Sequence, residues 1–281
     1  TTLNERERAA VAQQLDLLMA PCADTPVSLA QCVVEKRECK TCKPAAELVA
    51  RLVRAAVPAT DLVEFYKMRF DPENVKTIEI GKAPFKGPED APVTIVEWAD
   101  FQCPACRDSR HAMNLALERF PGQVRVVYKY YKITGHDRAL EAAYAAEAAH
   151  KQGKFWEMHD KIFENPEALS RSDLRKYARE LDLDLEKFKK DFDAEETKKL
   201  VEADIKQADE LGLDATPLFY VNGRVYSMNP FSPEFEHWIE LELQERGVEP
   251  AKPTAKYAEI RKELGLDKRA AGDPLAPGSA E

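Results

Sequence analysis

The sequence lacks the features that would direct it to a membrane or to nucleic acid. None of its apolar runs reaches the roughly 18 residues that a membrane-spanning helix needs. Positive charge is not in excess, because 50 acidic residues outnumber 41 lysines and arginines and leave a net charge of −9. This balance argues against non-specific binding to nucleic acid or to an anionic membrane surface. The sequence also contains no internal repeat.

The composition is that of a globular protein with a sizeable core. The 281 residues are enough for one large domain with an appendage, or for two domains. Hydrophobic residues make up 44% and charged residues 32% of the chain. Six cysteines are many for a cytosolic enzyme, and their even number fits an oxidising compartment. The positions of these cysteines are therefore the most informative feature of the sequence.

Two cysteines form the motif Cys103-Pro104-Ala105-Cys106 where an apolar run meets a helix-like stretch. The unpaired N–H groups and positive dipole end of a first helical turn would lower the pKa of Cys103 below about 8.5. Cys106, one turn later, can attack a mixed disulfide on Cys103. The alternatives are a structural disulfide or half of a zinc site, but only His111 of the five histidines is close enough to add a ligand.

A second motif, Thr216-Pro217, enters a predicted strand that ends in an Asn222-Gly223 hairpin turn. Proline inside a strand removes a ladder hydrogen bond, so its presence needs a reason. A cis Thr216–Pro217 bond beside the cysteines would supply that reason. The alternative is a kink at the edge of the sheet.

Taken together, these motifs resemble the DsbA-like branch of the thioredoxin-fold thiol–disulfide oxidoreductases. The resemblance rests on residues 100–106, on Thr216-Pro217 about 110 residues later and on segment 152–160, and it covers roughly residues 77–247. It implies an α/β thioredoxin fold with an inserted helical subdomain at about residues 137–211. It also implies protein thiols and disulfides as substrates and a periplasmic or otherwise extracytoplasmic location. No metal or organic cofactor is needed.

Glu97 lies within the apolar strand, six residues before Cys103. A central parallel strand is buried on both faces, and burial raises the pKa of a carboxyl group. We expect Glu97 to accept the proton of Cys106 as this thiol attacks the mixed disulfide. The resemblance places an acid at the matching position. The alternative is a salt-bridged glutamate at the end of a strand.

Candidate substrate contacts surround the cysteines and comprise Phe101, Gln102, Pro104, Ala105 and Thr216. With a cis bond at Pro217, Thr216 would present backbone groups to which an extended substrate segment pairs as an added strand. Trp98 is expected in the core. His136 matches a family position, but a capping or surface role is expected for it.

Residues 1–72 are predicted to form a small all-helical unit, which loosely resembles the leaders found ahead of some DsbA-like domains. It carries the other four cysteines, Cys22, Cys32, Cys39 and Cys42. Four cysteines allow three pairings, and two structural disulfides would stabilise a unit with so limited a core. A second redox pair at Cys39-Lys40-Thr41-Cys42 and a four-thiolate zinc site remain open as alternatives.

The predicted domains are thus the helical unit at 1–72, the thioredoxin domain at 77–247 and a polar, partly disordered tail at 248–281. Within the second domain we predict a short strand at 77–80, a loop at 82–92 and the central strand at 93–98. In the tail we predict a helix at 255–264 and disorder over 265–281.

We expect a thiol–disulfide oxidoreductase in which Cys103 is the exchanged thiol and Cys106 the resolving thiol. The Pro-Ala dipeptide between them carries no charged or imidazole group, which predicts a milder oxidant than the strongest of the family, between about −120 and −270 mV. Donation of disulfides is the first expectation, and reduction or isomerisation the alternative. A redox-inert module that binds a partner through its N-terminal unit is an alternative of another class. The sequence does not identify the redox partner that would reset the site.

Overall fold

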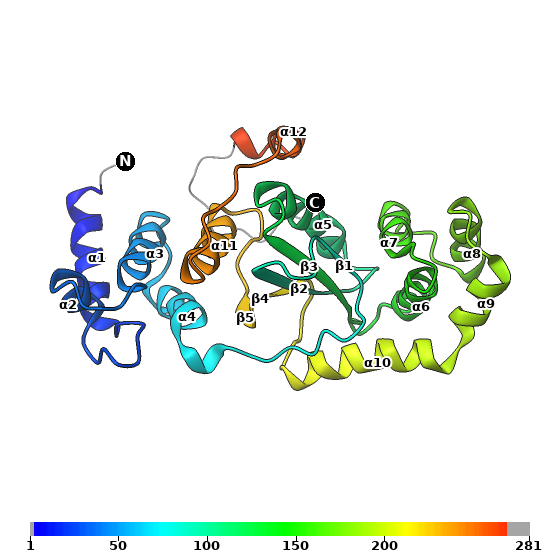
Figure 1. The fold of residues 1–281 in the computed structure, drawn as a ribbon, viewed down its shortest axis with the longest axis horizontal. Coiled ribbons are helices and arrows are strands. Elements are labelled where there is room, and N and C mark those ends of the chain that lie inside the picture. Colours follow the sequence, from blue (N-terminus) through cyan, green and yellow to red (C-terminus); the bar gives the residue numbers. More distant parts are fainter. Residues whose placement is uncertain (1–2, 269–281) are drawn as a thin grey trace.

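The computed structural model describes residues 3–268, with a five-stranded sheet at its centre (Figure 1). The strands are β1 (Phe85–Lys86), β2 (Val93–Ala99), β3 (Val124–Tyr130), β4 (Leu218–Val221) and β5 (Arg224–Tyr226). Their order is β1-β3-β2-β4-β5, with β2 and β3 parallel and the other pairs antiparallel. The central strands β2 and β3 are rich in valine because both of their faces are buried.

Helices cover both faces of this sheet. On one face α5 (Pro104–Arg119) and α11 (Pro233–Glu245) pack in a common core with β2 and β3. Both helices begin with proline, whose missing N–H would be unpaired in the first turn anyway. On the other face α10 (Glu195–Glu210) packs through Ala208 onto Trp98, which is fully buried as expected. The sequence therefore forms the predicted α/β fold.

A helical subdomain lies between β3 and β4, at the right of Figure 1. It consists of α6 (Ala139–His150), α7 (Phe155–Glu164), α8 (Arg171–Glu180), α9 (Leu185–Asp193) and α10. Helix α6 contacts each of the other four, and its buried face is made almost wholly of alanine. Because alanine side chains are short, the surrounding helices approach α6 closely. These helices occupy the range in which the insertion is predicted.

The N-terminal residues form α1 (Glu5–Leu17), α2 (Leu29–Val34), α3 (Cys42–Arg54) and α4 (Ala59–Phe70), followed by a 3-10 turn at Pro72–Asn74. Two disulfides, Cys22–Cys39 and Cys32–Cys42, join the segments around α2 and α3. This is the two-disulfide arrangement among the alternatives that the sequence leaves open. Cys39 and Cys42 are bonded to different partners, not to each other.

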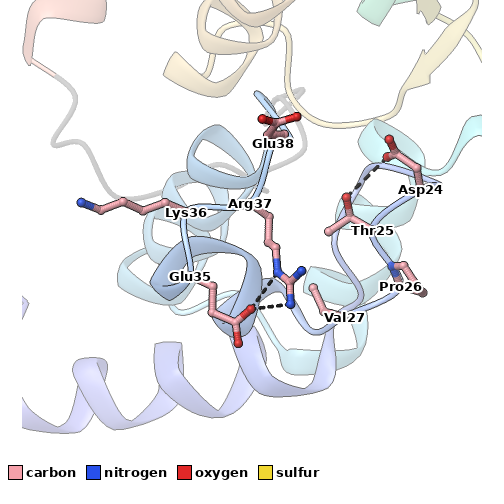
Figure 2. Close-up of a pocket in the computed structure, with 8 residues that line it drawn as sticks. All are labelled: Asp24, Thr25, Pro26, Val27, Glu35, Lys36, Arg37 and Glu38. Carbon is pink, nitrogen blue, oxygen red and sulfur yellow. Dashed lines mark hydrogen bonds and ion pairs between the residues drawn. The ribbon is translucent and has the colours of Figure 1, made fainter.

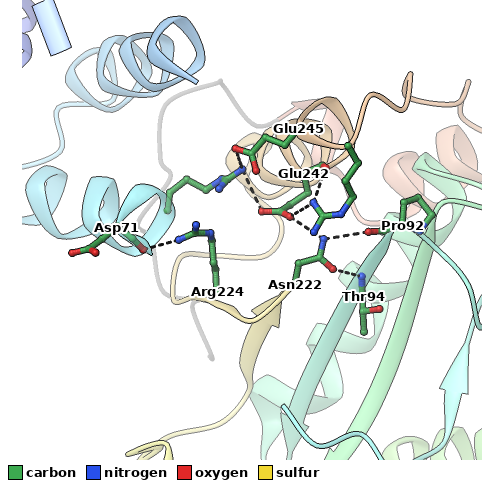
Figure 3. A network of polar contacts seen from close by, with 9 residues as sticks. Asp71, Pro92, Thr94, Asn222, Arg224, Glu242 and Glu245 are labelled. Atoms are coloured by element: carbon green, nitrogen blue, oxygen red, sulfur yellow. Dashed lines mark hydrogen bonds and ion pairs between the residues drawn. The ribbon is translucent and has the colours of Figure 1, made fainter. Parts of the chain in front are cut away.

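A buried polar network fixes these N-terminal helices to the sheet (Figure 3). Arg69 of α4 is 1% exposed and forms ion pairs with Glu242 and Glu245 of α11. Glu242 also accepts a hydrogen bond from the Asn222 side chain, whose oxygen in turn accepts from the backbone N–H of Thr94 in β2. The network thus connects an N-terminal helix, a core helix, the β4–β5 turn and the central strand.

The segment that links α4 to the sheet differs from its prediction. No ladder forms at residues 77–80; the one bridge nearby joins Val75 to Arg224 of β5. Ile78 and Ile80 instead pack, partly buried, against the cluster around Trp98. The edge strand is β1 instead, which lies inside the predicted loop at 82–92. Its two residues pair with β3. This pairing depends on tertiary packing, and no alternating pattern in the sequence indicates it.

The C-terminal segment is ordered further than the sequence indicates. Helix α12 (Ala255–Glu263) packs on α5, where the backbone N–H of Thr254 donates to the carbonyl of Glu118 over 2.9 Å. A 3-10 turn follows at Leu266–Lys268, within the range predicted to be disordered. The rest of that prediction, residues 269–281, lies outside the described residues. Among the helices that the structure does describe, none combines the length and apolar character needed to cross a bilayer.

Candidate active site

The two remaining cysteines lie where β2 ends and α5 begins. Cys103 is the N-cap residue of α5 and has an extended backbone conformation, while Cys106 belongs to the first turn. Neither thiol is in a disulfide, and the two residues are 7% and 1% exposed. The intervening Pro104 and Ala105 are exposed. A thiol of another molecule can therefore approach Cys103 and Cys106 over this uncharged dipeptide.

The two thiols differ strongly in acidity. A hydrogen bond from Cys106, helped by hydrogen bonds from backbone N–H groups of the first turn, lowers the pKa of Cys103 to about 5 against the opposing effect of burial. Burial, together with the neighbouring Cys103, raises the pKa of Cys106 well above its usual range. At neutral pH the pair therefore holds a thiolate on Cys103 and a protonated thiol on Cys106.

The Thr216-Pro217 motif lies directly against the cysteines. The Thr216–Pro217 peptide bond is cis, and the Thr216 carbonyl oxygen is 3.5 Å from the Cys103 sulfur. Strand β4 follows at Leu218 and pairs there with Trp98 of β2, which brings the two distant segments together. Within residues 3–268 the buried hydroxyl of Thr216 has no hydrogen-bond partner.

Glu97 is buried near the end of β2, where Ser109 of α5 connects it to the turn that carries Cys106. It is 3% exposed, and burial raises its pKa to about 7, although the Ser109 hydrogen bond and the charge of Lys86 act in the opposite direction. The Ser109 hydroxyl lies 2.6 Å from Glu97 Oε1 and 2.8 Å from the carbonyl oxygen of Cys106. Sequence reasoning missed Ser109, although its place three residues after Cys106 puts it on the same face of the helix.

Two of the candidate substrate contacts have other partners. Phe101 is 2% exposed and packs against Tyr128 and Phe163 with ring-centroid separations of 5.4 and 5.0 Å. It therefore belongs to the core beneath the cysteines, in contrast to the expectation that it lines a substrate groove. The side-chain oxygen of Gln102 accepts a hydrogen bond from the backbone N–H of Arg138, just before α6.

Asp100 and His136 form a contact that was not predicted. Asp100 is fully buried, and its Oδ2 lies 2.8 Å from His136 Nδ1. The sequence gives a weak signal for this pair, since Asp100 is part of the motif and His136 matches a family position, but 36 residues separate them. The expected capping or surface role of His136 is thus replaced by a contact with the active-site loop.

Other candidate binding sites do not coincide with the cysteine pair. In the described part of the chain, the one close group of three or more metal-ligating side chains is Cys32, Cys39 and Cys42, and these sulfurs are in disulfides. A surface cleft lies between residues 24–27 and 35–38 of the N-terminal helices (Figure 2). Its Arg37 is paired with Glu35 at 2.6 Å, so its charge is already compensated.

Comparison with known proteins places this geometry in a family. Residues 79–241, more than half of the chain, match a family model described as Thioredoxin. BdbD from Bacillus subtilis, solved in its oxidised form, is 28% identical, with a TM-score of 0.54 over 60% of this chain and 97% of that one. ScsC from Proteus mirabilis has a TM-score of 0.50 over 86% of this chain and 100% of its own, at 14% identity. The chain belongs to the thioredoxin family, and its fold is that of the DsbA-like thiol–disulfide oxidoreductases.

Curated relatives share one segment with this chain. The Na(+)/H(+) antiporter NhaA 3 of Salinispora tropica is 37% identical over 176 residues, which make up 62% of this chain and 26% of the relative. The antiporter NhaA of Herminiimonas arsenicoxydans is 39% identical over 139 residues, or 50% of this chain and 22% of the relative. The chain thus spans about a quarter of the length of these relatives.

Proposed function

We propose that this protein donates disulfide bonds to protein thiols through Cys103 and Cys106. The observation that carries the proposal is the thiol of Cys103, whose pKa is lowered to about 5 at the start of α5. Stabilising the thiolate stabilises the reduced form of the pair, and this makes its disulfide the stronger oxidant. The value lies between the roughly 3.5 of DsbA and the roughly 7 of thioredoxin. It supports a potential between theirs, about −120 to −270 mV.

The reaction starts from the Cys103–Cys106 disulfide. A substrate thiolate attacks the Cys103 sulfur, and Cys106 leaves as a thiolate that takes a proton from Glu97. A second substrate thiolate then attacks the mixed disulfide, which forms the substrate disulfide and releases Cys103 as its stable thiolate. In the reverse direction Cys106 gives its proton to Glu97 and attacks the mixed disulfide. Glu97 suits this transfer because its pKa of about 7 lies near neutral pH.

The proposed substrate is an extended segment of a protein. It would lie over the exposed Pro104 and Ala105 and pair with the backbone of Thr216, which adjoins the Cys103 sulfur. We place this reaction in an oxidising, extracytoplasmic compartment, and the two N-terminal disulfides support that location. Repeated turnover then needs a redox partner that reoxidises the cysteine pair.

The test is an equilibrium titration in glutathione buffers, with the state of all six cysteines read by alkylation and peptide mass spectrometry. We expect a Cys103–Cys106 potential of about −120 to −180 mV and faster oxidative refolding of a reduced protein. A potential near −270 mV, with cleavage of insulin disulfides in the presence of a thiol donor, would instead identify a reductase. Absence of both activities would leave a redox-inert binding module.

A further inference from the structure

The backbone of Asp100 contacts both cysteines of the site. Its N–H donates to the Cys106 sulfur over 3.4 Å, and its carbonyl oxygen accepts from the backbone N–H of Cys103 over 3.0 Å. The backbone N–H of Asp100 therefore already points at Cys106, the resolving thiol.

The side chain of Asp100 holds this backbone in place. Oδ1 accepts from the backbone N–H of Gln102 over 2.7 Å, which closes the turn that leads to Cys103. Oδ2 accepts from the backbone N–H of Ile133 over 2.8 Å and lies 2.8 Å from His136 Nδ1. Asp100 is fully buried, so these contacts are shielded from water, whereas the His136 side chain is 26% exposed. The active-site turn is thereby tied to the loop before α6.

We propose that Asp100 is a positioning residue for the resolving step, because its side chain fixes its own backbone N–H as the donor that stabilises the Cys106 thiolate. His136 supports this arrangement as the third partner of the carboxylate, beside the backbone N–H groups of Gln102 and Ile133. The proposal rests on the proposed exchange function and assigns to Asp100 the step in which Cys106 closes the disulfide.

The charge that develops on Cys106 makes such a donor effective. Cys106 is 1% exposed, and its sulfur interacts with Cys103, Thr216 and the backbone N–H of Asp100, without any cationic side chain in hydrogen-bond contact within the described residues. A thiolate at this position depends on dipoles that already point at it, since reorienting them during the reaction would cost free energy. The Asp100 carboxylate has the opposite electrostatic effect on the thiolate, and its contact with His136 reduces that effect.

The closing step can be followed with glutathione disulfide. The Cys103 thiolate attacks one glutathione sulfur and releases one glutathione thiolate, which leaves a mixed disulfide on Cys103. Cys106 then passes its proton to Glu97 and attacks the Cys103 sulfur, and the second glutathione leaves as a thiolate. Acid quenching and intact mass measurement separate the two steps, because the adduct and the closed disulfide differ in mass. The rate of closure does not depend on the concentration of glutathione disulfide.

We expect Asp100→Asn to slow closure about tenfold, because an amide cannot accept all three N–H groups, while the first attack changes less than about twofold. Asp204→Asn is the matched control. Its carboxylate is also mostly buried and accepts from the backbone N–H of Tyr130, but it pairs with Lys129 and touches neither cysteine. Both variants should lose stability, and only Asp100→Asn should lose the closing rate. If Asp100→Asn does not fold, His136→Ala replaces it, with an expected threefold slower closure.

Closure in Asp100→Asn at the rate of Asp204→Asn would overturn the positioning role. Faster closure would also overturn it, since it would mean that the negative charge of Asp100 outweighs the fixed N–H. If His136→Ala is used because Asp100→Asn does not fold, an unchanged rate of closure overturns the proposal. A wild-type protein in which glutathione disulfide produces neither an adduct on Cys103 nor a Cys103–Cys106 disulfide would refute the proposed function itself, and the inference would fall with it.

Discussion

The chain contains two Cys-x-x-Cys sequences, and the cysteines of only one of them are free thiols. Cys39 and Cys42 are bonded to Cys22 and Cys32, whereas Cys103 and Cys106 are free and adjacent to each other. Cys103 is the N-cap residue of α5, so its sulfur lies at the positive end of the helix. In the N-terminal motif Thr41 is the N-cap residue of α3, and Cys39 precedes the helix. The spacing is the same, and the placement of the first cysteine relative to its helix differs.

The first prediction gives the largest effect. Cys103→Ser should abolish thiol–disulfide exchange, while Cys106→Ser should still form a mixed disulfide with substrate and accumulate it. In both variants the Cys22–Cys39 and Cys32–Cys42 disulfides should stay intact. Alkylation with peptide mass spectrometry measures all of these states. Residual exchange in Cys103→Ser, with alkylation locating it at Cys22, Cys32, Cys39 or Cys42, would show that the N-terminal cysteines take part in the chemistry.

The second prediction concerns the potentials of the two sites. We expect the N-terminal disulfides to remain oxidised at potentials that reduce Cys103–Cys106, with midpoints below about −300 mV, as structural disulfides have. Their cysteines are poorly accessible, since Cys32, Cys39 and Cys42 are each at most 6% exposed. If all six cysteines titrate in one range, the two motifs form a relay and the contrast between them is lost.

The sequence predicted the parts of the site that are encoded locally. Cys103, Cys106 and Glu97 lie on one strand–turn–helix segment, so motif spacing and the apolar strand pattern suffice to bring them together. Ser109 was within reach of the same reasoning. The contact between Asp100 and His136 was not, because it depends on how the loop after β3 packs against the turn before α5.

Pairing of cysteines and pairing of strands are both long-range properties, and both escaped local reasoning. Four cysteines have three possible pairings, and only the packing of α2 against α3 selects one of them. The strand predicted at 77–80 has the right residues but no partner strand. The β4–β5 turn, by contrast, is predicted from its Asn222-Gly223 sequence. Glycine is required at its second position because a Cβ on Gly223 would lie 2.3 Å from the carbonyl oxygen of Lys76.

The third prediction separates stability from activity. Replacing Cys32 and Cys42 together by alanine should lower the free energy of unfolding by about 2–4 kcal/mol, because the unfolded chain loses a cross-link. Exchange at Cys103 should stay within about twofold, since the Arg69 network still holds the N-terminal helices against α11. Denaturant unfolding and glutathione exchange measure the two quantities. A large loss of exchange would mean that the N-terminal disulfides help to shape the active site.

The last prediction concerns the pH dependence that Glu97 gives to the active site. Closure of the mixed disulfide should accelerate as the pH rises through about 7, where Glu97 becomes able to accept a proton. Glu97→Gln should slow closure at least tenfold and flatten its profile between about pH 6 and 8. Quenched glutathione reactions at several pH values provide the measurement, and an unchanged profile would exclude the role.

The same substitution should affect stability in the opposite direction. Because burial raises the folded-state pKa of Glu97 from 4.5 to about 7, the native protein holds a proton that the unfolded chain has lost. The contribution of Glu97 to stability therefore falls as the pH rises from about 4.5 to 7 and is least favourable above that range. Glu97→Gln should thus be more stable than wild type at pH 8, by up to about 3 kcal/mol, with little difference at pH 4. Denaturant unfolding at the two pH values tests this sign. A stabilised but slow variant would show that the buried carboxyl group is kept for the exchange reaction at a cost in stability, whereas the N-terminal cysteines contribute to stability alone.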